Sequence, residues 1–108
     1  MSLDLPSLTI ASWRECLIAR TARAVDLIVA YRGEIERRNQ ELNAYLEVFA
    51  NAEQMAEESD KWLAAGRAPR PLEAVPLAIK DNILIEGQIC SAASKMLATY
   101  RAVYSATV

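Results

Sequence analysis

The chain has 108 residues, of which 53% are hydrophobic, and its 12 basic and 14 acidic side chains give a formal net charge of −2. This length allows one domain at most, and the charge gives no electrostatic case for direct contact with nucleic acid. The sequence contains no histidine, which excludes Ser-His-Asp chemistry, Cys-His chemistry and a histidine-ligated metal site within these residues. Without a signal peptide or an apolar run of about 18 residues, we expect a soluble, cytoplasmic protein that does not contact a membrane.

Three helices are predicted in the first two thirds of the chain, over about residues 10–20, 22–40 and 52–65. Their candidate N-caps are small polar residues, namely Thr9, Thr21 and Asn51. Gly66 follows the third helix in the C′ position, where glycine commonly ends a helix. We therefore expect a helical first part that is bounded by ordinary capping residues.

Apolar side chains recur every three or four residues in these segments and predict which face of each helix is buried. In the first helix the buried residues should be Trp13 and Leu17. In the second helix they should be Val25, Ile28, Val29 and Ile35. In the third helix they should be Met55, Trp62 and Leu63.

Three short strands are predicted over about residues 43–49, 75–80 and 83–86. The most distinct is the run from Val75 to Ile79, which is continuously apolar and bounded by turn formers, as is typical of a buried strand. Pro76 cannot donate to a ladder and should lie near the start or on the edge side of that strand. Helices followed by strands predict an α/β fold.

Lys80 closes this apolar run and is the candidate functional residue. A lysine at the end of a strand most often extends its ammonium into water, and the pattern alone favours this interpretation. A second interpretation is a lysine held in a dry site, where desolvation disfavours the charged form and makes the amine a usable base.

The stretch Pro71–Asn82 resembles the catalytic-lysine segment of the amidase signature family, which has the pattern Pro-Leu-x-Gly-Ile/Val-Pro-x-x-Ile/Val-Lys-Asp. Other segments resemble the family in the same order, namely Leu42–Tyr45, Gly87, Ser91–Leu97 and Tyr104–Val108. The resemblance therefore covers nearly the whole chain. Ala74 stands where the family usually has glycine, and it would be strained if that position requires a positive φ.

This resemblance implies that residues 1–108 form a single N-terminal segment of an amidase domain, with the first strands of a large mixed sheet. It implies that Lys80 is the catalytic base, which takes a proton from a nucleophilic serine through a second serine in a cis peptide. Attack by the nucleophile would give an acyl-enzyme. We expect the preceding apolar run to bury Lys80, and Asp81 to turn away or to bind backbone groups.

In the family both serines lie on a Gly/Ser-rich stretch, whereas this sequence has only three separated glycines. We therefore expect the 108 residues to lack the serine nucleophile and to be inactive alone. Ser91 and Ser94 could in principle pair with Lys80, but no glycines that could form an oxyanion hole accompany them.

Within the family, the tRNA-dependent amidotransferase subunits are most similar. The implied reaction is hydrolysis of glutamine to supply ammonia for amidating misacylated Glu-tRNA(Gln). The implied partners are the rest of the amidase domain and sister amidotransferase subunits. ATP and Mg would be bound by a partner subunit, with no cofactor or metal in this chain. Two alternatives are the start of a different small-amide amidase, and a non-enzymatic module that self-associates or pairs with another chain.

Overall fold

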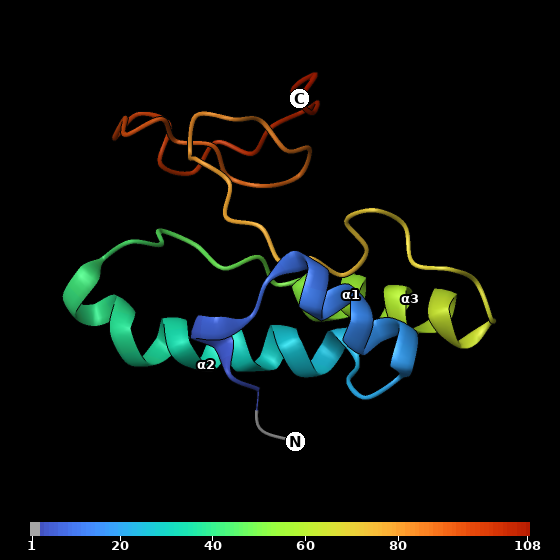
Figure 1. The fold of residues 1–108 in the computed structure, drawn as a ribbon. Coiled ribbons are helices and arrows are strands. Elements are labelled where there is room, and N and C mark those ends of the chain that lie inside the picture. The colour runs from blue at the N-terminus through green and yellow to red at the C-terminus, as the bar shows by residue number, and fades with distance from the viewer. Residues whose placement is uncertain (1–2) are drawn as a thin grey trace. The chain divides into compact units, whose positions relative to one another are not determined.

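The computed structural model describes residues 3–108, and the chain divides into two compact units between Pro76 and Leu77 (Figure 1). The first unit contains the helices, which are the short 3-10 helix η1 (Leu5–Ser7), α1 (Ile10–Ala19), α2 (Ala24–Leu42) and α3 (Ala52–Ala64). Residues 77–108 contain no helix or strand. Their backbone forms turns and one isolated antiparallel bridge, between Ile89 and Arg101.

The three predicted helices are present, and the N-cap of α1 is the one that the sequence predicts. The Thr9 hydroxyl accepts a hydrogen bond from the Ser12 backbone N–H at 3.0 Å, and the Ser12 hydroxyl accepts one from the Thr9 N–H at 2.9 Å. This reciprocal pair satisfies two of the N–H groups that every helix start leaves without a partner. Local side-chain chemistry therefore fixes where α1 begins.

The N-cap predicted for α2 is wrong, because Arg23 and not Thr21 occupies that position. Arg20 adopts a left-handed conformation at the end of α1, and the N–H of Thr21 donates to the carbonyl of Cys16. Thr21 thus belongs to the closing turn of α1. Asn51 does precede α3, although its side chain makes no capping hydrogen bond, and Gly66 follows α3 with a φ of +83°.

The core of the first unit is a small cluster formed by Trp13, Leu17, Ala22 and Leu27. The prediction for α1 is confirmed, because Trp13 and Leu17 are 2% and 3% exposed. Leu63 and Val75 pack against this cluster from the side. The core therefore joins the first two helices and also touches α3 and the segment that precedes Pro76.

The predicted buried faces of α2 and α3 are partly wrong. Ala24 and Leu27 are the buried residues of α2, whereas Val29 is 52% exposed. On α3 the buried residue is Ala56, and Met55 is 59% exposed. Helix α2 packs directly against α3, and small side chains such as alanine allow the two backbones to approach. A prediction based on the spacing of large hydrophobic residues overlooks these alanines.

Two polar contacts join α2 to α3 beyond this packing. The Asp60 carboxylate of α3 accepts hydrogen bonds from the N–H groups of Ala24 and Val25 at 2.7 and 3.2 Å. Arg32 of α2 also forms an ion pair with Glu53 of α3. A carboxylate at a helix N-terminus satisfies free N–H groups and complements the helix dipole, so Asp60 serves α2 as a cap from a different helix.

The three predicted strands, at 43–49, 75–80 and 83–86, are not formed in the part of the chain that the structure describes. In the first, the Asn39 side chain hydrogen-bonds both the N–H and the carbonyl of Tyr45, at 2.9 and 2.8 Å. The N–H and carbonyl of Tyr45 are therefore already hydrogen-bonded and are not available to pair with a neighbouring strand. Residues 75–80 have no neighbouring strand in this structure, and a strand exists only when its backbone groups are paired. Of the predicted α/β fold, the described residues therefore show the helices but not the strands.

Across residues 3–108, none of the helices is both long and apolar enough to cross a membrane.

Candidate functional site

The segment that resembles the amidase motif begins in the helical unit with two consecutive turns. The N–H of Glu73 donates to the carbonyl of Arg70 at 3.0 Å, and that of Val75 donates to the carbonyl of Leu72 at 3.2 Å. Ala74 lies between them with a φ of 57°, in the left-handed region that favours glycine. The position at which this sequence has alanine in place of glycine therefore does require a positive φ.

The carbonyl of Ala74 accepts a hydrogen bond from the indole Nε1 of Trp13 at 3.1 Å. Trp13 is the largest side chain of the core cluster, and its indole N–H requires a partner when the ring is buried. The strained turn at Ala74 is thereby fastened to α1.

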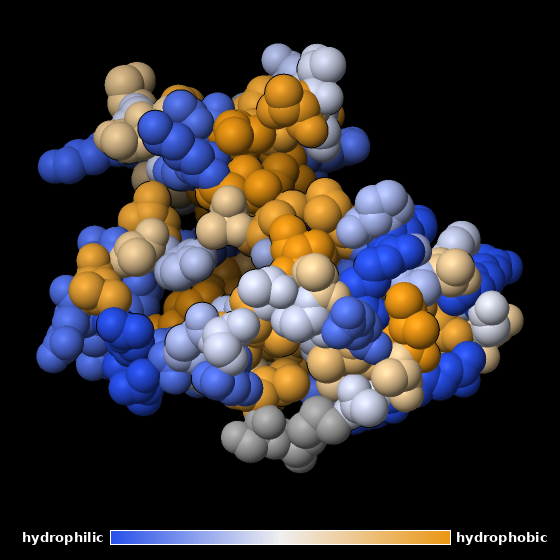
Figure 2. Space-filling view, viewed as in Figure 1, coloured by the Kyte–Doolittle hydropathy of each residue, from blue (hydrophilic) through white to orange (hydrophobic). Residues whose placement is uncertain are grey.

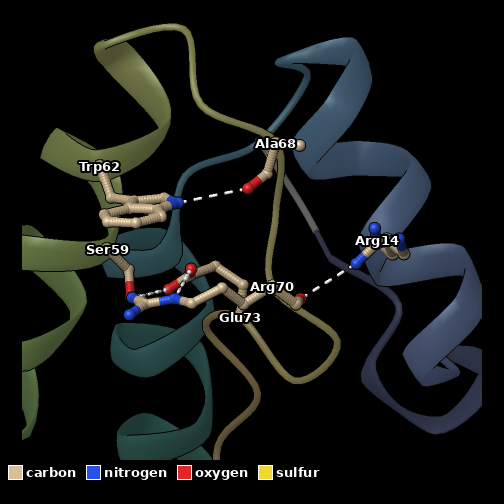
Figure 3. A network of polar contacts seen from close by, with 6 residues as sticks. All are labelled: Arg14, Ser59, Trp62, Ala68, Arg70 and Glu73. Carbon is tan, nitrogen blue, oxygen red and sulfur yellow. Dashed lines mark hydrogen bonds and ion pairs between the residues drawn. The ribbon is translucent and has the colours of Figure 1, made fainter.

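Glu73 is a buried acid inside the same turn, and sequence reasoning missed it (Figure 3). Arg70 donates to its carboxylate from Nε at 2.6 Å and from Nη2 at 3.0 Å, and the hydroxyl of Ser59 donates at 2.7 Å. The hydrogen bonds from Arg70, followed by the one from Ser59, hold the pKa of the Glu73 carboxyl below its usual value against the opposing effect of burial. The signal for this pair was the i,i+3 spacing of Arg70 and Glu73.

The same loop is fastened to both flanking helices (Figure 3). The Arg14 guanidinium of α1 donates to the carbonyl of Arg70 at 3.0 Å. The Trp62 indole of α3 donates to the carbonyl of Ala68 at 3.2 Å. The guanidinium groups of Arg67 and Arg70 each lie 4.3 Å from the centre of the Trp62 ring, within the range of a cation–π contact. The role of this network is to hold the loop that precedes the motif.

Lys80 lies in the second unit, and its surroundings differ from the prediction. Its side chain is exposed, and the preceding apolar run does not bury it, since Leu77 and Ile79 are 70% and 42% exposed. The Lys80 carbonyl accepts a hydrogen bond from the N–H of Ile83 at 3.0 Å, which closes a turn directly after the lysine. The residues described here therefore do not bury the amine of Lys80.

Asp81 binds a backbone group, as expected from the sequence. Its carboxylate accepts hydrogen bonds from the backbone N–H of Ser91 at 3.0 Å and from the Ser91 hydroxyl. The hydroxyl contact, followed by the backbone contact, keeps the pKa of the Asp81 carboxyl below its usual value. Among the described residues Asp81 makes no ion pair with Lys80, and the Ser91 hydroxyl is committed to Asp81 rather than to Lys80.

The main chain of Asp81 reinforces this contact. Its carbonyl accepts hydrogen bonds from the N–H of Ala92 at 3.0 Å and from the Cys90 thiol at 3.2 Å. Ala92 and Ala93 have positive φ values, so the backbone curls around Asp81 immediately after Ser91. Cys90 is a buried free thiol, and Cys16 is a partly buried one.

The second unit presents several large apolar side chains to solvent, as Figure 2 shows in orange. The exposed aliphatic residues come from both ends of the unit and from its middle: Leu77, Ile79, Met96, Leu97, Val103 and Val108. The rings of Tyr100 and Tyr104 are exposed as well. Only Cys90 and Ala102 of this unit are buried. An apolar surface of this kind is typical of a segment that packs against further protein.

Comparisons with known proteins show the family to which the chain belongs. The family model described as Amidase matches residues 26–108, which include the Lys80 motif and the Asp81–Ser91 contact. The chain therefore belongs to the amidase family.

The similar proteins within that family include the A subunit of glutamyl-tRNA(Gln) amidotransferase from Rhizobium meliloti (strain 1021). This relative is 44% identical over 106 residues, which is 97% of this chain and 21% of that protein. The protein of the same name from Prosthecochloris aestuarii is 44% identical over 88% of this chain and 20% of its own length. The one from Bartonella tribocorum is 41% identical over 97% and 21%. The chain spans about a fifth of the length of these relatives.

Proposed function

We propose that these residues are the N-terminal part of an amidotransferase subunit that hydrolyses the side-chain amide of glutamine. The ammonia released would amidate misacylated Glu-tRNA(Gln) on a sister subunit. The observation that carries this proposal is the similarity along 97% of the chain to a protein named as the A subunit of glutamyl-tRNA(Gln) amidotransferase. ATP and Mg would act at the partner subunit, and the chain contributes no cofactor site to the proposal.

Lys80 is the proposed catalytic base. It would accept the proton of a nucleophilic serine through a second serine, and attack on the amide carbon would release ammonia and leave an acyl-enzyme. Neither serine is identified among the 108 residues. We therefore propose that the 108-residue chain is inactive without further protein. The exposure of Lys80 and the apolar surface around it fit this requirement, because packing of further protein over that surface would desolvate the amine.

The first experiment is to read the coding frame beyond Val108. A Gly/Ser-rich stretch with paired serines supports the proposal, and a stop codon directly after Val108 would rule out this chemistry for the polypeptide alone. In the complete protein, Lys80→Ala should nearly abolish glutamine hydrolysis with the fold intact, whereas Lys95→Ala, which alters an exposed lysine, should retain it. Full turnover in Lys80→Ala would remove Lys80 from the mechanism.

A second candidate function is that of a non-enzymatic module that binds another chain or itself. The exposed apolar side chains of the second unit favour it. Sedimentation equilibrium of the 108-residue chain across a wide concentration range tests this alternative. A monomer at every concentration would count against self-association.

A further inference from the structure

The acid that follows Lys80 in the sequence is fully engaged by hydrogen bonds. Both carboxylate oxygens of Asp81 are used, one by the N–H of Ser91 and the other by the Ser91 hydroxyl. An acid in this position would otherwise be free to pair with the lysine ammonium beside it. An ion pair would stabilise the charged form of the lysine, which cannot accept a proton.

The contact also closes a loop of the second unit. The Asp81 side chain binds Ser91, and the Asp81 carbonyl binds the N–H of Ala92 and the thiol of Cys90. Asp81 is therefore held through its side chain and its main chain to the same short segment. The carboxylate cannot swing toward Lys80 without breaking both bonds to Ser91.

The remaining charged groups of the second unit are Glu86, Lys95 and Arg101. Arg101 donates to the carbonyl of Gly87 at 3.0 Å. None of these three groups forms an ion pair with Lys80 or Asp81 among the described residues. Asp81 is the acid nearest to Lys80 in the sequence, and among the described residues it forms no ion pair with the amine.

We propose that Ser91 is a positioning residue for Lys80, which acts by holding the Asp81 carboxylate away from the lysine amine. Ser91 does not take part in the reaction itself. Its role rests on the proposed function of Lys80 as a base, but the electrostatic effect on the amine is a property of the chain that can be measured without turnover.

The test is competitive labelling of amines in the 108-residue chain with trace acetic anhydride at pH 8, read by peptide mass spectrometry. The chain has three lysines, and Lys95 serves as the internal reference. In Ser91→Ala the backbone N–H of residue 91 still holds Oδ1 of Asp81, but Oδ2 loses its hydroxyl donor and becomes available to pair with Lys80. The labelling ratio of Lys80 to Lys95 should then fall about two- to threefold, the size expected for an exposed ion pair.

Three further variants separate this effect from a general loosening of the loop. Ser91→Thr keeps the hydroxyl and should retain the original ratio. Ser94→Ala should also retain it, because among the described residues the bonds to the Asp81 carboxylate come from Ser91 and not from the Ser94 hydroxyl. The double variant Asp81→Asn, Ser91→Ala should restore the ratio, because no charge is left to pair with the amine. A merely structural effect of Ser91→Ala would persist in the double variant and would overturn the proposal.

Asp81→Asn alone provides a measurement that does not depend on how Ser91→Ala folds. It should leave the ratio unchanged, because the carboxylate is already held away from Lys80. An increase of twofold or more would show that Asp81 and Lys80 are already paired, and would refute the proposal. If labelling follows the expectation while Lys80→Ala in the complete protein retains turnover, the positioning of Asp81 stands and the proposed catalytic role fails.

Discussion

The indole nitrogen of Trp13 donates a hydrogen bond to the carbonyl oxygen of Ala74, 61 positions further along the chain. This contact joins the first helix to the turn that opens the amidase motif. Trp13 lies in the core cluster, and Ala74 is held in a left-handed conformation that alanine adopts at a cost. The geometry of the motif therefore depends on a residue far from it in the sequence.

Replacing Trp13 with phenylalanine should destabilise the helical unit by about 1–2 kcal/mol, because a partly buried carbonyl loses its donor and the smaller ring leaves unfilled space. Urea unfolding followed by circular dichroism measures the change. Trp62→Phe is the matched control, since its indole donates to Ala68 at an exposed position. A loss in the control as large as that in Trp13→Phe would contradict a special role for the Ala74 contact.

Ala74→Gly should stabilise the unit by about 0.5–1 kcal/mol, because glycine adopts a positive φ without the steric cost that alanine bears. Part of the gain is offset by the loss of a methyl group that packs against the core. Ala68→Gly, in the same loop but without a positive φ, is the control and should be neutral or destabilising. The midpoint of thermal unfolding reports both changes, and a lower midpoint for Ala74→Gly than for the unaltered chain would show that strain is absent.

Glu73→Gln should lower the free energy of unfolding at pH 7 by about 2 kcal/mol, since a buried acceptor loses its charge-assisted hydrogen bonds from Arg70 and Ser59. Glu34→Gln is the control, because its partner Arg37 is exposed, and it should change stability by less than about 0.5 kcal/mol. Equal losses in the two variants would show that burial of the Glu73 carboxylate has no energetic importance.

The stability of the unaltered chain should also depend on pH through Glu73. Its folded pKa lies below the ordinary value of 4.5, so the ionised carboxylate contributes fully above pH 4.5 and this contribution is lost as the pH falls through the folded pKa. Glu73→Gln should therefore lose less stability than the unaltered chain between pH 7 and pH 3. Parallel stability curves for the two proteins over that range would disprove the linkage.

Asp60→Ala should destabilise the unit by about 1–2 kcal/mol, because the N–H groups of Ala24 and Val25 lose the carboxylate that caps α2. Glu57→Ala, on the exposed face of the same helix, is the control and should have almost no effect. Chemical denaturation of the two variants gives the comparison. Retained stability in Asp60→Ala would mean that water replaces the cap without cost.

The parts of the fold that the sequence predicts correctly depend on contacts between near neighbours. The Thr9 cap and the buried pair of Trp13 and Leu17 follow from residues three or four positions apart, and both are confirmed. The error at Arg23 arose because the turn that closes α1 extends through Thr21. Ala56 was missed because packing between helices selects small side chains as well as large ones. Leu27 was missed because the buried face of α2 was assigned to Val25, Ile28, Val29 and Ile35.

The strands were predicted wrongly for a different reason. An apolar run such as Val75–Ile79 shows that a segment favours burial, but pairing depends on a neighbouring strand that the run itself does not specify. In the candidate site, the engagement of Asp81 was foreseen, although its partner Ser91, ten positions away, was not. For Ala74 the family resemblance gave only a condition, that alanine would be strained if the position requires a positive φ, and the structure supplies the φ of 57° that no periodicity in the residues indicates.

The cap that Asp60 provides also bears on the order in which the helical unit folds. The N–H groups of Ala24 and Val25 in the first turn of α2 receive their acceptor from Asp60, 36 and 35 positions later, so this cap forms only when α3 has docked. Forming the first turn of a helix is costly because several backbone dihedrals are fixed for one hydrogen bond, and a cap on its N–H groups offsets part of that cost. We therefore expect α2 to form from its middle outward, and the junction between α1 and α2 to become ordered in the same cooperative step that brings α3 into place.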